Sequence, residues 1–166
     1  MKKMMKNRKG FTLMEMLIVV AIIAILVIIA IPTFNSALAK ARAATDVANI
    51  RSGYAAAQVE AMTNGVDKTE ANNTYYLQKD GSVSNANSGR DDYKTQGESS
   101  KAATGSSIGG KFDVGTTASG NTIAWSKGQQ ITYVVKDADK DGVPEVTEIK
   151  PIGGTTTGGG AGQTNP

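Results

Sequence analysis

The sequence predicts an α+β protein in which one long, kinked N-terminal α-helix packs on a small antiparallel β-sheet head. Three observations predict this arrangement. An apolar run at 11–31 is followed by an alanine-rich segment at 34–62, whose apolar residues recur at helical spacing. Nearer the C-terminus, segments 122–126, 130–136 and 143–150 have strand-like composition and are separated by glycine-containing turns.

The composition excludes several classes of function. The chain of 166 residues has no cysteine and no histidine, so it cannot form a disulfide or a thiolate metal site, and it lacks the commonest general base. We therefore expect no enzyme. Five of the 18 basic residues precede Gly10, which leaves 13 basic and 15 acidic residues after it. The pI of about 9.1 reflects this short leader and indicates no direct nucleic-acid motif.

The apolar run is long enough to cross a membrane. Residues 11–31 form a segment of about 32 Å as a helix, and only Thr12 and Glu15 in it are polar. The basic leader before the run predicts a cytoplasmic N-terminus and an exported remainder. A secretory signal places its small-residue cleavage site after the apolar run, but here the small residue at the boundary, Gly10, stands before it.

A family resemblance rests on residues 9–15, which read Lys-Gly-Phe-Thr-Leu-Met-Glu, together with the apolar run and Pro32. This N-terminal stretch resembles that of type IV pilins and the related pseudopilins. The resemblance implies the type IV pilin fold. It also implies that residues 1–10 are a leader peptide, that a membrane peptidase cuts after Gly10, and that the new N-terminal residue, Phe11, is methylated.

Glu15 is the one charged residue in the apolar run. A carboxylate inside a membrane segment costs about 2.5–3.5 kcal/mol on insertion scales. One interpretation is an acid that reaches the membrane surface from near the end of the run. The resemblance implies instead that Glu15 pairs with the Phe11 ammonium of a neighbouring subunit and fixes the register of a filament, because a buried carboxylate is tolerated when it is paired.

The second half of the helix, residues 32–65, is amphipathic. Pro32 lacks a backbone donor and is expected to kink or locally melt the helix; the alternative is that it ends the helix. Continuation is favoured because a single apolar stripe follows it, made of Val47, Ile50, Tyr54, Ala57 and Ala61. We expect the polar surface to consist of Lys40, Arg42, Asp46 and Arg51. Residues 63–65, Thr-Asn-Gly, form a stop signal.

Residues 66–152 are expected to form a globular head. The connection at 66–110 is predicted to hold one short strand, 74–77, and then a mobile surface loop rich in serine, glycine and asparagine from Ser82 onward. Residues 111–152 are predicted to form an antiparallel meander of the three C-terminal strands. The last segment, 153–166, is nearly all glycine, threonine and small polar residues, and we expect it to be disordered.

The segment 137–148 carries a second signal. Asp137, Asp139, Asp141, Gly142 and Glu148 fit the D-x-D-x-D-G-x₅-E spacing of a calcium loop. The flanking strands differ from the helices of an EF-hand, so Glu145, nearer the turn, is an alternative ligand to Glu148. Some pseudopilins resemble this arrangement, with Ca²⁺ beside their last strands. The other interpretation is a solvated hairpin turn, where Asp and Gly are favoured.

The leading hypothesis is a structural subunit of a type IV pilus, held in the membrane as a single-pass protein and then polymerised into an extracellular filament. The resemblance implies as partners further copies of the chain, a prepilin peptidase and methyltransferase, an assembly platform with its motor ATPase, and minor pilins. One alternative is a pseudopilin of a type II secretion or DNA-uptake system. The polar segment 82–110 favours a pilus, and the calcium-like spacing favours a pseudopilin. A third hypothesis is a membrane-anchored binding protein.

Overall fold

The computed structural model describes residues 10–65, 73–85, 90–137 and 143–153. It consists of one long helix, α1 (Leu13–Asn64), followed by short strands. The chain divides into two compact units, Met1–Leu38 and Ala39–Pro166, and we describe each by itself. The long N-terminal helix and the antiparallel sheet that packs on its second half confirm the predicted α+β class and match a type IV pilin fold.

α1 begins and ends as the sequence predicts. It continues through Pro32, so the alternative in which this proline ends the helix is wrong. At the other end, Gly65 has a φ of 73° and donates its N–H to the Ala61 carbonyl at 2.9 Å. This is an αL cap, in which glycine adopts the left-handed conformation without steric cost and satisfies a terminal carbonyl. The predicted stop at 63–65 is therefore confirmed.

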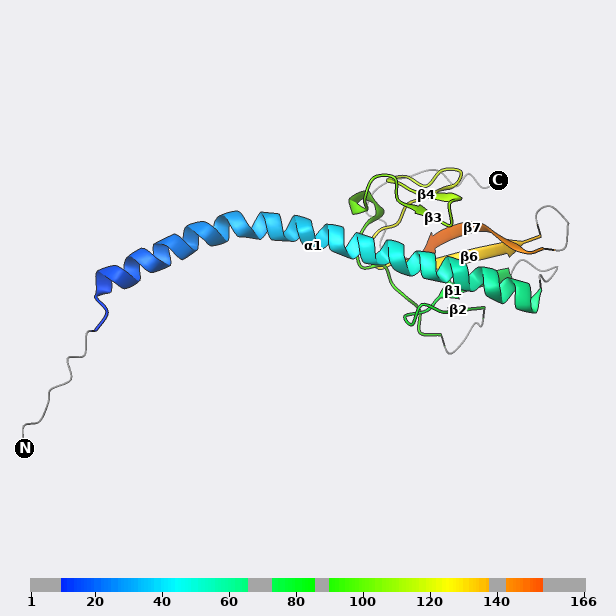
Figure 1. Ribbon diagram of the computed structural model, residues 1–166, viewed down its shortest axis with the longest axis horizontal. Helices are drawn as coiled ribbons and strands as arrows, with labels where there is room; N and C mark the ends of the chain where they lie inside the picture. The colour runs from blue at the N-terminus through cyan, green and yellow to red at the C-terminus, as the bar shows by residue number, and fades with distance from the viewer. Residues whose placement is uncertain (1–9, 66–72, 86–89, 138–142, 154–166) are drawn as a thin grey trace, which may run out of the picture. The chain divides into compact units, whose positions relative to one another are not determined.

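The main sheet lies along the second half of α1 (Figure 1) and has the strand order β2-β1-β6-β7. Its strands are β1 (Thr74–Leu77), β2 (Val83–Ser84), β6 (Gln130–Lys136) and β7 (Glu145–Ile152). All neighbouring strands are antiparallel. β1 and β6 have their predicted ranges, and β7 begins and ends two residues later than predicted.

A second sheet corrects the predicted meander. β3 (Ser107–Ile108) pairs antiparallel with β4 (Phe112–Val114), and β4 pairs in parallel with β5 (Thr122–Ile123). The segment 122–126 was expected to pair with β6, but only two of its residues form a strand, and they belong to this second sheet. The place beside β6 is taken by β1, which is far away in sequence.

The core lies between the second half of α1 and the main sheet. The predicted helix stripe is confirmed, because Val47, Ile50, Ala57 and Ala61 are buried and Tyr54 is half-buried. Contact is closest at Gly53, where a Cβ atom would come within 2.6 Å of a Leu77 methyl carbon and would also clash with the hydroxyl of Tyr133. That hydroxyl donates to the Ile50 carbonyl at 2.9 Å, so β6 is hydrogen-bonded directly to the helix.

The prediction of a surface loop from Ser82 to Gly110 is wrong for much of the segment. It contains β2, β3 and a 3₁₀ turn, η2 (Ser99–Lys101), and it buries Tyr93, Thr95, Ser99 and Ile108. The low apolar content misled the prediction because most of what this segment buries is polar and hydrogen-bonded.

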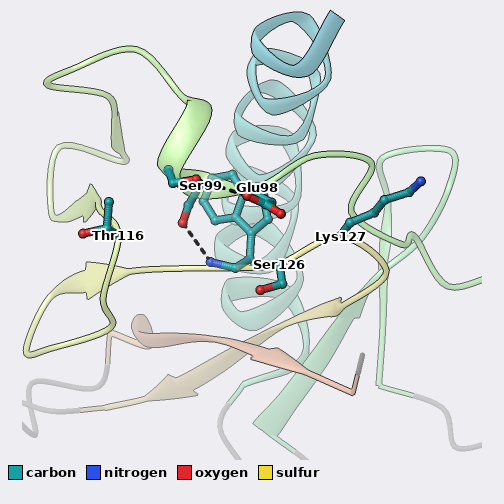
Figure 2. Close-up of a pocket in the computed structure, with 7 residues that line it drawn as sticks. Glu98, Ser99, Thr116, Ser126 and Lys127 are labelled. Carbon is teal, nitrogen blue, oxygen red and sulfur yellow. Dashed lines mark hydrogen bonds between the residues drawn. The ribbon is translucent and has the colours of Figure 1, made fainter. Parts of the chain in front are cut away.

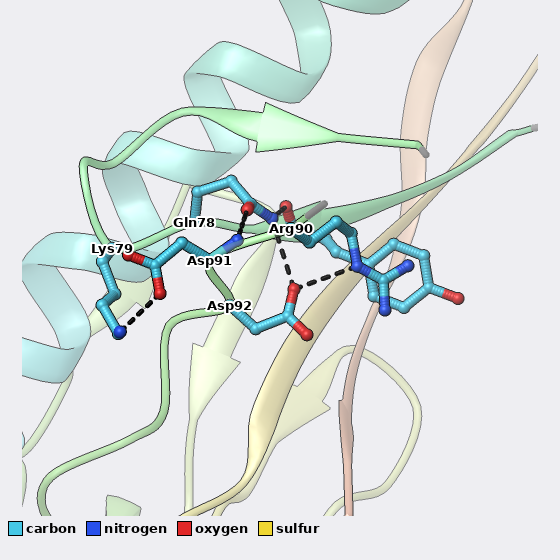
Figure 3. A network of polar contacts seen from close by, with 6 residues as sticks. Gln78, Lys79, Arg90, Asp91 and Asp92 are labelled. Atoms are coloured by element: carbon cyan, nitrogen blue, oxygen red, sulfur yellow. Dashed lines mark hydrogen bonds and ion pairs between the residues drawn. The ribbon is translucent and has the colours of Figure 1, made fainter. Parts of the chain in front are cut away.

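Polar contacts fasten residues 90–92 to the end of β1 (Figure 3). The Gln78 side chain accepts from the Asp91 N–H at 2.8 Å and donates to an Asp92 carboxylate oxygen at 3.4 Å. Arg90 pairs with Asp92 at 3.0 Å, and its guanidinium carbon lies 3.6 Å from the centre of the Tyr76 ring. These contacts hold residues 90–92 at the end of β1, directly before the buried Tyr93.

Candidate processing and assembly site

The predicted cleavage position lies in exposed, non-helical backbone. Gly10 and Phe11 precede Leu13, the first residue of α1, and Phe11 is 80% exposed. A Cβ atom built at Gly10 would meet no other atom within 4 Å. Packing within the described part of the chain therefore gives no reason for glycine at this position.

Thr12 and Glu15 form a capping box at the start of α1. The Thr12 N–H donates to Glu15 Oε2 at 2.8 Å, and the Glu15 N–H donates to the Thr12 hydroxyl oxygen at 3.2 Å. The Thr12 hydroxyl also donates to Glu15 Oε2, at 2.9 Å. Each side chain thus satisfies a backbone donor that the helix leaves without a partner. The Thr-x-x-Glu spacing is visible in the sequence, and our sequence analysis missed it.

Glu15 therefore has one carboxylate oxygen engaged and one available. In the ranges that the structure describes, the hydrogen-bond donors to its side chain both belong to Thr12, and both reach Oε2. Cleavage after Gly10 would leave this box intact, because Thr12 would keep its peptide N–H. Such a cut would create an ammonium at Phe11, and Oε1 is chemically suited to accept a hydrogen bond from such a group on another chain.

The first half of α1 presents its apolar side chains to the outside. The large apolar residues from Phe11 to Phe34 are 47–82% exposed. This part of α1 is also long and apolar enough to cross a membrane, with a mean hydropathy of 3.2 over its most apolar window. A helix that is apolar on all sides and uncovered by its own chain needs a bilayer or other helices around it.

Asp46 is the residue that the sequence analysis placed wrongly. It was expected on the polar surface of α1, yet its side chain is 0% exposed. Oδ1 accepts from the Tyr93 hydroxyl at 2.6 Å and the Gln96 N–H at 2.8 Å. Oδ2 accepts from the Gly97 N–H at 2.7 Å and the Trp125 indole N–H at 3.2 Å.

These four donors explain how a carboxylate is tolerated in the core, because a buried charge is costly unless its hydrogen bonds are satisfied. They come from positions 47 to 79 residues further along the chain. Asp46 therefore ties α1 to the segment 93–97 and to Trp125. Gly97 lies directly on the helix, since a Cβ there would come within 2.7 Å of the Ala43 nitrogen.

The predicted calcium ligands are only partly visible. Asp139 and Asp141 lie outside the described residues, whereas Asp137 is half-buried at the end of β6. Glu145 Oε2 is 3.0 Å from the ammonium nitrogen of Lys111, and Glu148 Oε2 is 2.7 Å from that of Lys150. Among the described residues no group of three acidic side chains converges on one point. The structure does not bring Glu145 and Glu148 together with Asp137.

The comparison with family models matches residues 5–31 to the prokaryotic N-terminal methylation motif. This motif is the class III signal peptide of type IV pilins and pseudopilins, which are structural proteins, and it covers Gly10, Phe11 and Glu15. It marks a precursor that is anchored in the membrane before assembly. No solved structure matches the chain.

Proposed function

We propose that this chain, whose residues 5–31 match the N-terminal methylation motif of type IV pilins and pseudopilins, is the structural subunit of a type IV pilus. The precursor is cut after Gly10 and N-methylated at Phe11, and the mature chain is held in the membrane by the first half of α1. It then polymerises through this half of the helix into an extracellular filament.

One observation carries the proposal: the large apolar side chains from Phe11 to Phe34 are exposed. Burying each such side chain away from water is favourable by about 1.5–3 kcal/mol, so the segment has to be buried both before and after assembly. In the membrane the lipid buries it, and in a filament the same helices of other subunits bury it. A simple tether also needs an apolar helix, but it needs no acid at Glu15.

Glu15 gives the filament its register in this proposal. On leaving the bilayer, the carboxylate passes from near the membrane surface into a bundle of apolar helices, where an unpaired charge is very costly. Pairing with the Phe11 ammonium of a neighbouring subunit offsets this cost only at one axial offset between the two helices. Single polar groups fix register in coiled coils in the same way.

The partners follow from this life cycle. A prepilin peptidase and methyltransferase acts at Gly10 and Phe11, and an assembly platform with a motor ATPase extracts the subunit from the membrane. Further copies of the chain and minor pilins form the filament. The chain itself performs no chemistry in this scheme.

A pseudopilin that forms a short fibre is the second candidate. The polar segment 82–110 was expected on a filament surface, but Tyr93, Thr95, Ser99 and Ile108 within it are buried. The segment therefore does not favour a pilus over a pseudopilin. Electron microscopy of cells with and without the chain distinguishes the two candidates. Long surface filaments that require the chain indicate a pilus, and their absence from both kinds of cell favours a pseudopilin.

Mass spectrometry of the protein from cells tests the processing step. We expect a chain that begins with N-methylated Phe11. An intact Met1 would exclude both filament hypotheses and leave the membrane-anchored binding protein.

Calcium binding by Asp137, Asp139, Asp141 and either Glu145 or Glu148 stays a prediction. In our proposal Ca²⁺ would clip the β6–β7 turn of a head that has no cysteine for a disulfide. The melting temperature of the full chain in detergent, measured with Ca²⁺ and with a chelator, tests it. Equal melting temperatures would assign the aspartates to a solvated turn.

A further inference from the structure

Three cations gather on one side of the head, and we call them the basic face: Arg42, Lys101 and Lys127. They line one surface hollow of about 210 Å³ together with Ala39, Gln96, Gly97 and Glu98. The side chains of the three cations make no hydrogen bond and no ion pair with any residue in the described ranges. Glu98 is the only acid among the residues that line the hollow.

The fold brings the basic face together from three separate segments. Arg42 lies on α1, Lys101 ends η2, and Lys127 lies in the turn before β6. Gly97, which is hydrogen-bonded to Asp46 and packed on the helix backbone at Ala43, holds η2 beside Arg42. The turn is held by the Thr95 hydroxyl, which donates to the Ser126 carbonyl at 2.6 Å. Like charges that a rigid fold collects without internal partners attract an external anion.

The position of Arg42 along α1 indicates which anion is near. Arg42 follows Phe34, the last large apolar residue of the exposed stretch, by only eight residues of sequence. The basic face is therefore joined by a short length of chain to the segment that is apolar enough to cross a membrane. The anions at the surface of such a membrane are the phosphates of its headgroup layer.

We propose that the basic face is a docking surface for the anionic phosphate headgroups of the bilayer that holds the chain before assembly. The contact fixes the head against the membrane surface while the apolar helix half lies in the lipid. The inference rests on the proposed function only for this membrane-held state, so it does not require that a filament forms. Extraction into a filament then has to break the headgroup contacts.

Trp125 supplies a reporter beside the basic face. It is the single tryptophan of the chain, it lies two residues before Lys127, and its backbone N–H donates to the Ser99 hydroxyl oxygen at 3.1 Å. Glu98, Ser99, Trp125, Ser126 and Lys127 line a neighbouring polar hollow of about 460 Å³ (Figure 2), where the Lys127 side chain extends away from Thr116.

The test uses the full mature chain, one copy per lipid nanodisc, in phosphatidylcholine with or without phosphatidylglycerol. A nitroxide on the lipid headgroup quenches Trp125 fluorescence when the face lies on the membrane. We expect stronger quenching in the discs that contain phosphatidylglycerol. The difference should disappear at about 1 M salt, where the Debye length falls to about 3 Å.

A pair of matched variants locates the contact. Lys101→Gln with Lys127→Gln should lower quenching to the phosphatidylcholine level, because each lysine strengthens attachment to an anionic surface by roughly fivefold. Lys79→Gln with Lys136→Gln has the same net charge, changes exposed lysines on other parts of the head, and should leave quenching unchanged. Far-UV circular dichroism confirms that both variants are folded.

Three outcomes would overturn the proposal. The first is equal quenching in the two lipid compositions, and the second is an equal effect of the two double variants. The third is displacement by short DNA duplexes in the absence of any lipid dependence, which would assign the face to a nucleic acid. The absence of filaments in cells, by contrast, would refute the proposed function and leave this measurement untouched.

Discussion

Two acids on one helix have opposite surroundings. Glu15 lies exposed in the apolar half of α1 and accepts hydrogen bonds from Thr12 of its own chain. Asp46 lies in the head half, fully buried, and both of its oxygens accept from donors in distant segments. The fold therefore satisfies Asp46 completely and Glu15 only in part. The comparison teaches that Asp46 serves the fold, whereas Glu15 keeps a carboxylate oxygen that no residue in the described ranges engages.

The largest expected effect is on the stability of the head. Asp46→Ala leaves two backbone N–H groups, the Trp125 indole N–H and the Tyr93 hydroxyl without their acceptor. We expect the free energy of unfolding to fall by about 3–5 kcal/mol, measured by urea unfolding of the full chain in detergent with circular dichroism. Asp113→Ala, which removes an exposed acid on β4, should change it by less than about 0.5 kcal/mol. Equal stabilities of the two variants would contradict the conclusion that Asp46 stabilises the head.

Glu15→Gln separates the charge of Glu15 from its role in the capping box. Glutamine completes the same box, so α1 should start as before and the head should unfold at the wild-type urea concentration. Filament yield should fall at least about tenfold, because a loss of 1.4 kcal/mol of pairing already changes an equilibrium tenfold. Quantitative blotting of sheared filaments measures the yield.

The matched variant is Thr12→Ala, which removes the cap and keeps the charge. Its cost is about 0.5–2 kcal/mol, confined to the helix start, and we expect filaments in reduced but substantial amounts. If Glu15→Gln assembles better than Thr12→Ala, the cap and not the charge is what assembly needs.

Alkaline pH should destabilise the head through its buried tyrosines. Burial, and next the hydrogen bond to Asp46, raises the pKa of Tyr93 to about 12, and burial also raises the pKa of Tyr133. The folded state thus favours the neutral hydroxyls. The stability that these two tyrosines contribute is therefore fully present below pH 10 and is lost as pH rises toward about 12. We expect the free energy of unfolding to fall by an amount on the order of 2 kcal/mol through Tyr93. The midpoint of urea unfolding, measured at several pH values across this range, checks this expectation.

Tyr93→Phe tests the assignment of this alkaline loss. The variant should be less stable than wild type at pH 8, because the hydrogen bond to Asp46 is missing, and it should lose less stability between pH 10 and 12. An unchanged pH dependence would show that Tyr93 does not contribute to it.

The smallest expected effect is that of Gly53→Ala on stability, because a gain in helix propensity is opposed by a loss in packing. Gly53→Ala favours the helical state by about 1 kcal/mol in an exposed position, but the new methyl group meets Leu77 and Tyr133. Overpacking a tight core costs about 1–3 kcal/mol, so we expect a small net loss of stability. Ser52→Ala, on the neighbouring exposed position, should be neutral or stabilising. A more stable Gly53→Ala would show that the core yields at this point.

The parts predicted well from the sequence are those with a local physical signal. α1 was predicted from the apolar run, the helix stripe and the Thr-Asn-Gly stop. β6 and its pairing with β7 were predicted from alternating apolar residues and from the turn residues between the two strands. The capping box at Thr12 and Glu15 also has a local signal, which was overlooked because Glu15 was considered only as an acid in an apolar run.

What sequence reasoning missed depends on contacts between distant residues. Nothing near Asp46 shows that its partners are Tyr93, Gln96, Gly97 and Trp125, and an aspartate beside a threonine in an alanine-rich helix looks like part of a polar face. In the same way, the pairing of β1 with β6 and of β4 with β5 has no local signal. Low apolar content at 82–110 predicted exposure, since composition does not reveal polar groups that are buried with partners.

The capping box lies on one side of the proposed cut, and this determines what the cut would change. Thr12 and Glu15 lie on the C-terminal side of the Gly10–Phe11 bond, so cleavage there would keep the hydrogen bonds that start α1. It would remove five basic side chains and create one terminal amine. In our proposal, maturation therefore changes the charge at the start of the helix and requires no refolding of it.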